Sequence, residues 1–164
     1  MEENVDIACK HRTALCQSPG YLTAYIAFGD DFFIPNIDQM FRDALIEATE
    51  AGYLRPSMVE PLTRVNSGNN TGRGIPNIEF EYQSGIDYVE VIPSIKGCGV
   101  ELYNKIKVFT IPEIGQNYEG IKKFVLECVC EAGGTACLPS AIGIGIGGQF
   151  DVAAKLSRKA MSIN

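Results

Sequence analysis

The sequence has a single histidine, His11, no Cys-x-x-Cys pair, and no apolar run near the roughly 20 residues that span a membrane. One histidine in an N-terminal arm leaves no credible Ser-His or Cys-His pair for nucleophilic catalysis. Without Cys-x-x-Cys, zinc-ribbon and thioredoxin-like interpretations have no support. The charged residues 1–12 lack the apolar stretch of a signal peptide, so we expect a cytoplasmic protein with no membrane partner.

Positive charge is also scarce. The 164 residues carry 14 Lys and Arg against 20 Asp and Glu, a net charge of −6. This balance argues against a nucleic-acid partner, which requires a basic surface. A small anionic substrate remains compatible, because a few local arginines and lysines suffice to hold a carboxylate. The length and the 46% hydrophobic content fit one domain with a core, over residues 1–164.

Hydrophobic periodicity and turn residues predict alternating strands and helices. Strands are predicted at residues 21–29, 77–82, 88–92 and 139–146, and helices at 36–51, 101–107, 118–131 and 148–161. The fold class is therefore α/β or α+β, a single layered domain with a mixed sheet and packed helices.

Several local features refine this prediction. The strands 77–82 and 88–92 are expected to form a hairpin. Asn36 is expected to cap the start of the helix at 36–51, and Gly52 its end. Residues 1–20 are expected to be an irregular arm. Residues 54–74 form a polar loop whose length is typical of functional loops. The strand at 139–146, with its alternating glycines, is expected to be buried beside a close neighbour.

The six cysteines are expected to be reduced thiols or metal ligands, because the chain is long and has no export signal. Cys128 falls on the apolar face of its helix and is predicted to be core. Cys130 is two positions further on, so these two thiols point apart and cannot share a metal. Three cysteines lie in predicted loops beside glycine or proline, where cluster ligands are better placed: Cys16, Cys98 and Cys137. Spacing alone still favours scattered thiols.

Two further patterns are candidates for anion binding. Residues 143–148 match G-x-G-x-x-G between a predicted strand and helix, but no acidic residue and second strand follow as a dinucleotide fold requires. Backbone amides approaching an anion or cluster are the simpler reading of this segment. The predicted loops also contain four cationic residues: Arg55, Arg64, Arg73 and Lys96. Arg64 and Arg73 are expected to be surface charges.

Six short motifs follow one another along the chain. They are TALCQSPG at 13–20, LRPSMVEPLTR at 54–64, IKGCGVE at 95–101, GIKKFVL at 120–126, EAGGTACLP at 131–139 and IGIGIGGQFD at 142–151. In this order they resemble motifs of class I fumarases and tartrate dehydratases, a family of iron–sulfur hydro-lyases. The sequence is similar to the family's α-type catalytic domain or subunit over nearly its whole length.

The resemblance implies a [4Fe–4S] cluster held by three cysteines, with one iron open to substrate. By position, Cys16 and Cys137 are two ligands, and the third lies further along than Asn164. We therefore predict that these two thiols lie close together. The implied catalytic residues are Gln17 and Arg55. The implied substrate-binding residues are Arg55, Lys96, Gly97 and Gly99.

The implied function is one component of a hydro-lyase that interconverts a dicarboxylic hydroxy acid and its unsaturated acid, as with malate and fumarate. The partners implied are a β-type subunit or domain, which supplies the proton-abstracting residue, and further copies in a homo- or hetero-oligomer. The substrate alternative is tartrate, for a tartrate dehydratase α subunit. A third alternative is a non-catalytic homologue that keeps only the fold.

Three positions depart from the family pattern. Ser18 stands where the family has aspartate, Cys98 where it has glycine, and Val100 where it has serine. Cys98 is either a replacement third ligand or a small residue tolerated in a turn, and we expect the latter. These departures favour the non-catalytic alternative, whereas Cys16 and Cys137 favour the enzyme.

Overall fold

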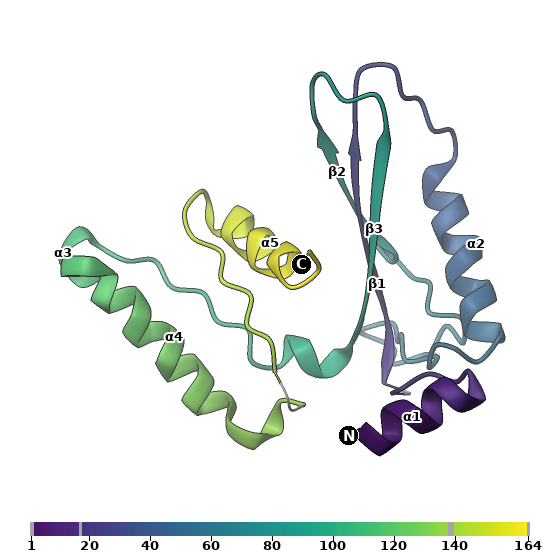
Figure 1. Ribbon diagram of the computed structural model, residues 1–164, viewed down its shortest axis with the longest axis horizontal. Coiled ribbons are helices and arrows are strands. Elements are labelled where there is room, and N and C mark those ends of the chain that lie inside the picture. Colours follow the sequence, from purple (N-terminus) through teal and green to yellow (C-terminus); the bar gives the residue numbers. More distant parts are fainter. Residues whose placement is uncertain (1, 17, 138–139, 164) are drawn as a thin grey trace. The chain divides into compact units, whose positions relative to one another are not determined.

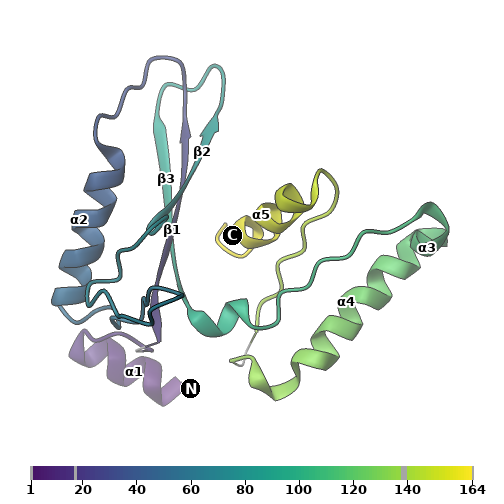
Figure 2. The ribbon, with the colours of Figure 1, turned by 180° about the vertical axis from the view of Figure 1, so that it is seen from behind.

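The computed structural model describes residues 2–16, 18–137 and 140–163 (Figures 1 and 2). Its contacts divide the chain into two compact units, Met1–Cys98 and Gly99–Asn164. Helices and a three-stranded mixed sheet confirm the α/β class. Within the described ranges, no helix is long and apolar enough to cross a membrane.

The sheet of the first unit has β1 (Pro19–Phe28) at its centre, as Figure 1 shows. β2 (Asn77–Tyr82) pairs with it in parallel and β3 (Val89–Gly97) antiparallel, in the order β2-β1-β3. The predicted hairpin is therefore wrong, because both of its strands pair with β1 instead of each other. β1 is buried without interruption from residue 22 to residue 27, which is typical of a strand covered on both edges and both faces.

Helix α2 (Ile37–Glu50) supplies Leu45 to a core that also contains Leu22, Leu54 and Ile75. Its end is as predicted. Gly52 has φ 79°, its N–H donates to the carbonyl of Thr49, and the next N–H donates to the carbonyl of residue 48. This is a Schellman motif. The predicted start is wrong in detail, because Asn36 has φ 55° and its side chain makes no capping hydrogen bond.

The loop between α2 and β2 is organised by one buried amide. Asn70 is fully buried, and its Oδ1 accepts hydrogen bonds from the N–H groups of Ser57 (2.9 Å) and Met58 (3.4 Å). Its Nδ2 donates to Thr49 Oγ1 (3.0 Å) and to the carbonyl of Arg55 (2.8 Å). The loop is thus fixed against α2 with few backbone bonds of its own.

The N-terminal arm is helical rather than irregular. α1 (Glu2–His11) has two glutamates in its first turn and Lys10 and His11 in its last turn. These charges complement the helix dipole, which is the physical reason that a helix forms here. All of its described residues are exposed or half-buried, so it adds little to the core.

The second unit is helical. Its elements are the end of η1 (Cys98–Glu101), α3 (Ile111–Ile114), η2 (Gln116–Tyr118), α4 (Glu119–Ala132), η3 (Gly133–Thr135) and α5 (Phe150–Ala160). α4 and α5 confirm two predicted helices, and Gly133, at φ 52°, ends α4 as expected. The helix predicted at 101–107 is wrong, because only the single turn of η1 forms there.

The strand predicted at 139–146 is wrong for residues 140–146, which belong to no sheet, while Pro139 lies outside the described residues. The predicted burial is also wrong, because Ile142, Ile144 and Ile146 are 57%, 49% and 65% exposed. The expected close neighbour is present. A Cβ at Gly143 would lie 2.0 Å from the carbonyl oxygen of Ser157, and one at Gly145 would lie 2.0 Å from that of Ala153. Both carbonyls belong to α5, so the glycines let the helix backbone pack directly on this segment.

Candidate functional site

Three of the six motifs meet at one end of the sheet in the first unit. The N–H of Arg55 donates a 3.1 Å hydrogen bond to the carbonyl of Pro19. Pro19 is also paired with Gly97 at the start of the β1–β3 ladder, where the register shifts before Tyr21. Segments that are about 40 residues apart in sequence therefore share one backbone network.

Two motif glycines make this approach possible. A Cβ at Gly20 would lie 2.5 Å from the carbonyl oxygen of Arg55 and 2.7 Å from Ser57 Oγ. A Cβ at Gly97 would lie 2.6 Å from Ser18 Oγ. Larger residues would force the three segments apart. Gly97, predicted from the resemblance to bind substrate, thus has a packing role that the structure shows directly.

The thiol of Cys16 is exposed at this junction. The N–H of Ser18 donates to its Sγ at 3.4 Å. This contact fixes the thiol beside the start of β1, and cysteine sulfur is a natural iron ligand. The chemistry of this donor therefore fits a cluster ligand.

Arg55 is held through its backbone at both its N–H and its carbonyl, while its side chain is exposed. A guanidinium positioned in this way can grip a carboxylate with two parallel hydrogen bonds. Lys96 is half-buried on β3, opposite Tyr21 of β1. Ser57 Oγ is buried, and it has no hydrogen-bond partner among the described residues. A buried hydroxyl of this kind calls for a partner from a ligand or a neighbouring group.

The other predicted site residues are placed as follows. Gln17 lies outside the described residues, as does the side chain of Cys98. Gly99 belongs to η1 and begins the second unit. Cys137 is exposed in the second unit, whereas Cys16 is in the first, so their approach stays a prediction. Over residues 2–16, 18–137 and 140–163, no three His, Cys, Asp or Glu side chains gather as a metal site.

Cys128 is half-buried on α4 rather than fully buried in a core. Burial raises the pKa of its thiol, the carboxylate of Glu131 raises it further, and the ammonium of Lys105 acts in the opposite direction. Lys105 and Glu131 form an ion pair at 3.0 Å beside it. A raised pKa disfavours the thiolate, which is the form of cysteine that binds iron.

We therefore expect Cys128→Ala to lower the free energy of unfolding by about 1 kcal/mol, through a small cavity. Urea denaturation followed by circular dichroism measures this loss. The iron bound after anaerobic reconstitution should match that of the wild type. Loss of iron in this variant would show that Cys128 is a ligand.

Sequence reasoning missed two residues of this region, Asn70 and Ser57. Asn70 lies in the polar loop 54–74, but none of the six motifs contains it. Nothing in the pattern indicated that its amide bridges four partners. Ser57 lies within a matched motif, but its burial depends on the approach of Gly20.

The fold and this junction define an α/β protein with an exposed thiol and a cationic side chain at the end of a mixed sheet. The chain belongs to the fumarate hydratase family, since the family model described as Fumarate hydratase (Fumerase) matches residues 1–164. The predicted family is thereby confirmed.

Named relatives support this assignment. The chain is 39% identical over 163 residues to a protein of Methanocaldococcus jannaschii provisionally named as the alpha subunit of L(+)-tartrate dehydratase. It is 33% identical over 162 residues to the Escherichia coli L(+)-tartrate dehydratase subunit alpha. A provisionally named class I fumarate hydratase of Geobacillus stearothermophilus is 33% identical over 166 residues.

These alignments cover 97%, 98% and 97% of this chain, in that order. They cover only 56% and 52% of the two alpha subunits and 32% of the fumarate hydratase. The chain thus spans about half the length of the alpha subunits that it matches.

Proposed function

We propose that this chain is an α-type component of a [4Fe–4S]-dependent hydro-lyase acting on a small dicarboxylic hydroxy acid. The observation that carries the proposal is the junction at the start of β1. There the N–H of Arg55 donates a hydrogen bond to the carbonyl of Pro19, three residues after the exposed thiol of Cys16. Three family motifs share this junction, which gives the motif residues a common location. Hydro-lyases are also what the relatives are named for.

Cys16 and Cys137 are the residues that would hold the cluster, with a third ligand from polypeptide beyond the described residues. Both thiols are exposed, and soft thiolates are the natural ligands of iron–sulfur clusters. When bound, the cluster supplies a Lewis-acid iron that polarises the substrate hydroxyl and carboxylate.

The chain's own residues bind and orient the substrate. Arg55 grips one carboxylate through its guanidinium, and its fixed backbone sets the direction of the side chain. Lys96 contributes positive charge from the adjacent strand, and the buried hydroxyl of Ser57 donates to a substrate oxygen. We assign Gln17 and Gly99 to substrate binding as well, from their positions in the motifs. The base that removes the proton comes from a β-type partner.

Tartrate is the second candidate substrate. The specific observation in its favour is that two of the relatives, at 39% and 33% identity, are named as L(+)-tartrate dehydratase alpha subunits. The chain and its β-type partner would form a cytoplasmic oligomer. Hydration and dehydration assays of that complex with fumarate, malate and L(+)-tartrate decide between the substrates, and inactivity on all three contradicts the proposal.

Anaerobic reconstitution with iron and sulfide tests the cluster directly. The chain alone is expected to bind iron weakly, since it supplies two of three thiolates. That binding should fall in Cys16→Ser and in Cys137→Ser. Cys9→Ser is the matched control, because Cys9 is also an exposed thiol and lies on α1, outside the six motifs in sequence.

Equal iron content in all four proteins would refute the assignment of these ligands. A stable cluster of about four irons per chain, lost in Cys98→Ser, would instead make Cys98 the third ligand.

A further inference from the structure

The backbone of segment 141–146 in the second unit is not paired with other described residues, and the segment is exposed or half-buried throughout. It lies in no helix or strand, and its described residues make no backbone hydrogen bond. Its sequence, Ala-Ile-Gly-Ile-Gly-Ile, alternates isoleucine with small residues, which is the pattern of a strand with two different faces. Water can reach these main-chain groups here, but any polypeptide that covers the segment must supply hydrogen-bond partners for them.

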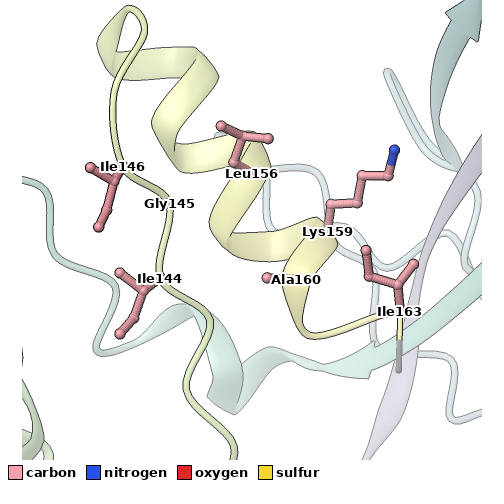
Figure 3. A pocket seen from close by; sticks show the side chains of 7 residues that line it. All are labelled: Ile144, Gly145, Ile146, Leu156, Lys159, Ala160 and Ile163. Carbon is pink, nitrogen blue, oxygen red and sulfur yellow. The ribbon is translucent and has the colours of Figure 1, made fainter.

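One face of the segment is already covered. Gly143 and Gly145 lie against the carbonyls of Ser157 and Ala153 in α5, too close for any side chain. Figure 3 shows α5 on this side and the side chain of Ile144 directed away from the helix. α5 therefore packs on this face of the segment through Gly143 and Gly145. Ile144 and Ile146 extend past the helix and also line a pocket beside Leu156 of α5.

The opposite side opens on an apolar groove of about 770 Å³, shared with α4. Ile144 and Ile146 line it together with Ile121, Val125 and Leu126. The exposed fractions are 49% for Ile144, 65% for Ile146 and 65% for Leu126. A groove this apolar beside an unpaired extended backbone marks an interaction surface.

We infer that residues 141–146 accept a β-strand from the α-type polypeptide that the relatives possess and this chain does not match. The strand would bond to the free main-chain groups and place alternating apolar side chains in the groove. A helix would cover the isoleucines but leave the backbone unpaired. This inference rests on family membership and on packing, and it does not depend on the proposed hydro-lyase activity.

The size of the unmatched polypeptide supports this occupant over a second copy. The chain covers 56% and 52% of the two alpha subunits, so nearly half of each is available. All the buried hydrophobic residues found in the described chain lie in the first unit, between Leu22 and Ile75. A second copy pairing through six residues would leave Leu102 (71% exposed) and Phe150 (69% exposed) of the second unit uncovered. A polypeptide of domain size can cover them as well.

Hydrogen exchange tests the inference on two proteins. The first is the chain itself. The second is a chimera in which the chain replaces its matched part of the Methanocaldococcus jannaschii alpha subunit. We expect the amides of 141–146 to exchange freely in the chain and at least about 100-fold more slowly in the chimera. In the chimera, Ile144→Pro removes one donor and should abolish the protection of its neighbours, whereas Val108→Pro, at another exposed position, should not.

Three results would overturn the inference. One is a chimera that unfolds cooperatively yet exchanges at 141–146 as fast as the chain. Another is protection in the chain alone that rises with its own concentration, which would identify a second copy as the occupant. If the chimera does not fold, the aligned segment is measured in the intact Methanocaldococcus jannaschii subunit. Slow exchange there supports the inference, and fast exchange is the third contrary result.

Discussion

Replacing Asn70 by alanine is expected to lower the free energy of unfolding of the first unit by about 3–5 kcal/mol. The side chain is fully buried and bonds to Ser57, Met58, Thr49 and Arg55. Its removal leaves two backbone N–H groups and one carbonyl without these partners. Asn70 also has φ 61°, a conformation that asparagine tolerates better than alanine.

Urea denaturation followed by circular dichroism measures this loss. The matched control is Asn66→Ala, at an exposed asparagine of the same loop that makes hydrogen bonds to Pro56 and Gly68. Because the groups that bond to Asn66 remain accessible to water, Asn66→Ala should lower the free energy of unfolding by at most about 1 kcal/mol. Equal losses in the two variants would show that the Asn70 amide does not organise the loop.

Asn70 also links stability to the candidate site. It accepts from Ser57 and donates to the carbonyl of Arg55, the two residues that flank Gly20. The alanine variant should therefore free the 54–64 segment from its position beside Pro19. Faster hydrogen exchange of the Arg55 amide at low denaturant would report this local release before global unfolding.

The second large effect is expected for Gly145→Ala in the second unit. Its Cβ would lie 2.0 Å from the carbonyl oxygen of Ala153 and 2.8 Å from the backbone nitrogen of Ser157. These are helix backbone atoms that cannot rotate away, so α5 must leave the segment. We expect a loss of about 3 kcal/mol or more and rapid exchange of the α5 amides.

Gly134→Ala is the control for this substitution. Gly134 also lies in the second unit, but a Cβ there would meet nothing within 4 Å. The control should change stability by no more than about 0.5 kcal/mol. If Gly145→Ala were as harmless as Gly134→Ala, α5 would not be packed on residues 143–145.

The helices α2, α4 and α5 and the three strands of the first unit were predictable, because their apolar spacing and terminal glycines are local properties of the sequence. Gly52 and Gly133 end their helices where the sequence indicates. The resemblance located Cys16 and Arg55 in motifs, and the family is confirmed. Each of these conclusions rests on residues near one another in the chain or on motif order.

The pairing of β2 and β3 with β1, the junction of three motifs and the role of Asn70 were decided by tertiary structure. The hairpin prediction rested on the short connection between β2 and β3, which is a local signal. In the structure both strands pair with β1 instead, so both edges of that central strand are covered. Segment 140–146 has the sequence pattern of a strand, but it pairs with no strand among the described residues of its unit. Periodicity reports which face of a segment is apolar, and only the folded chain determines what that face meets.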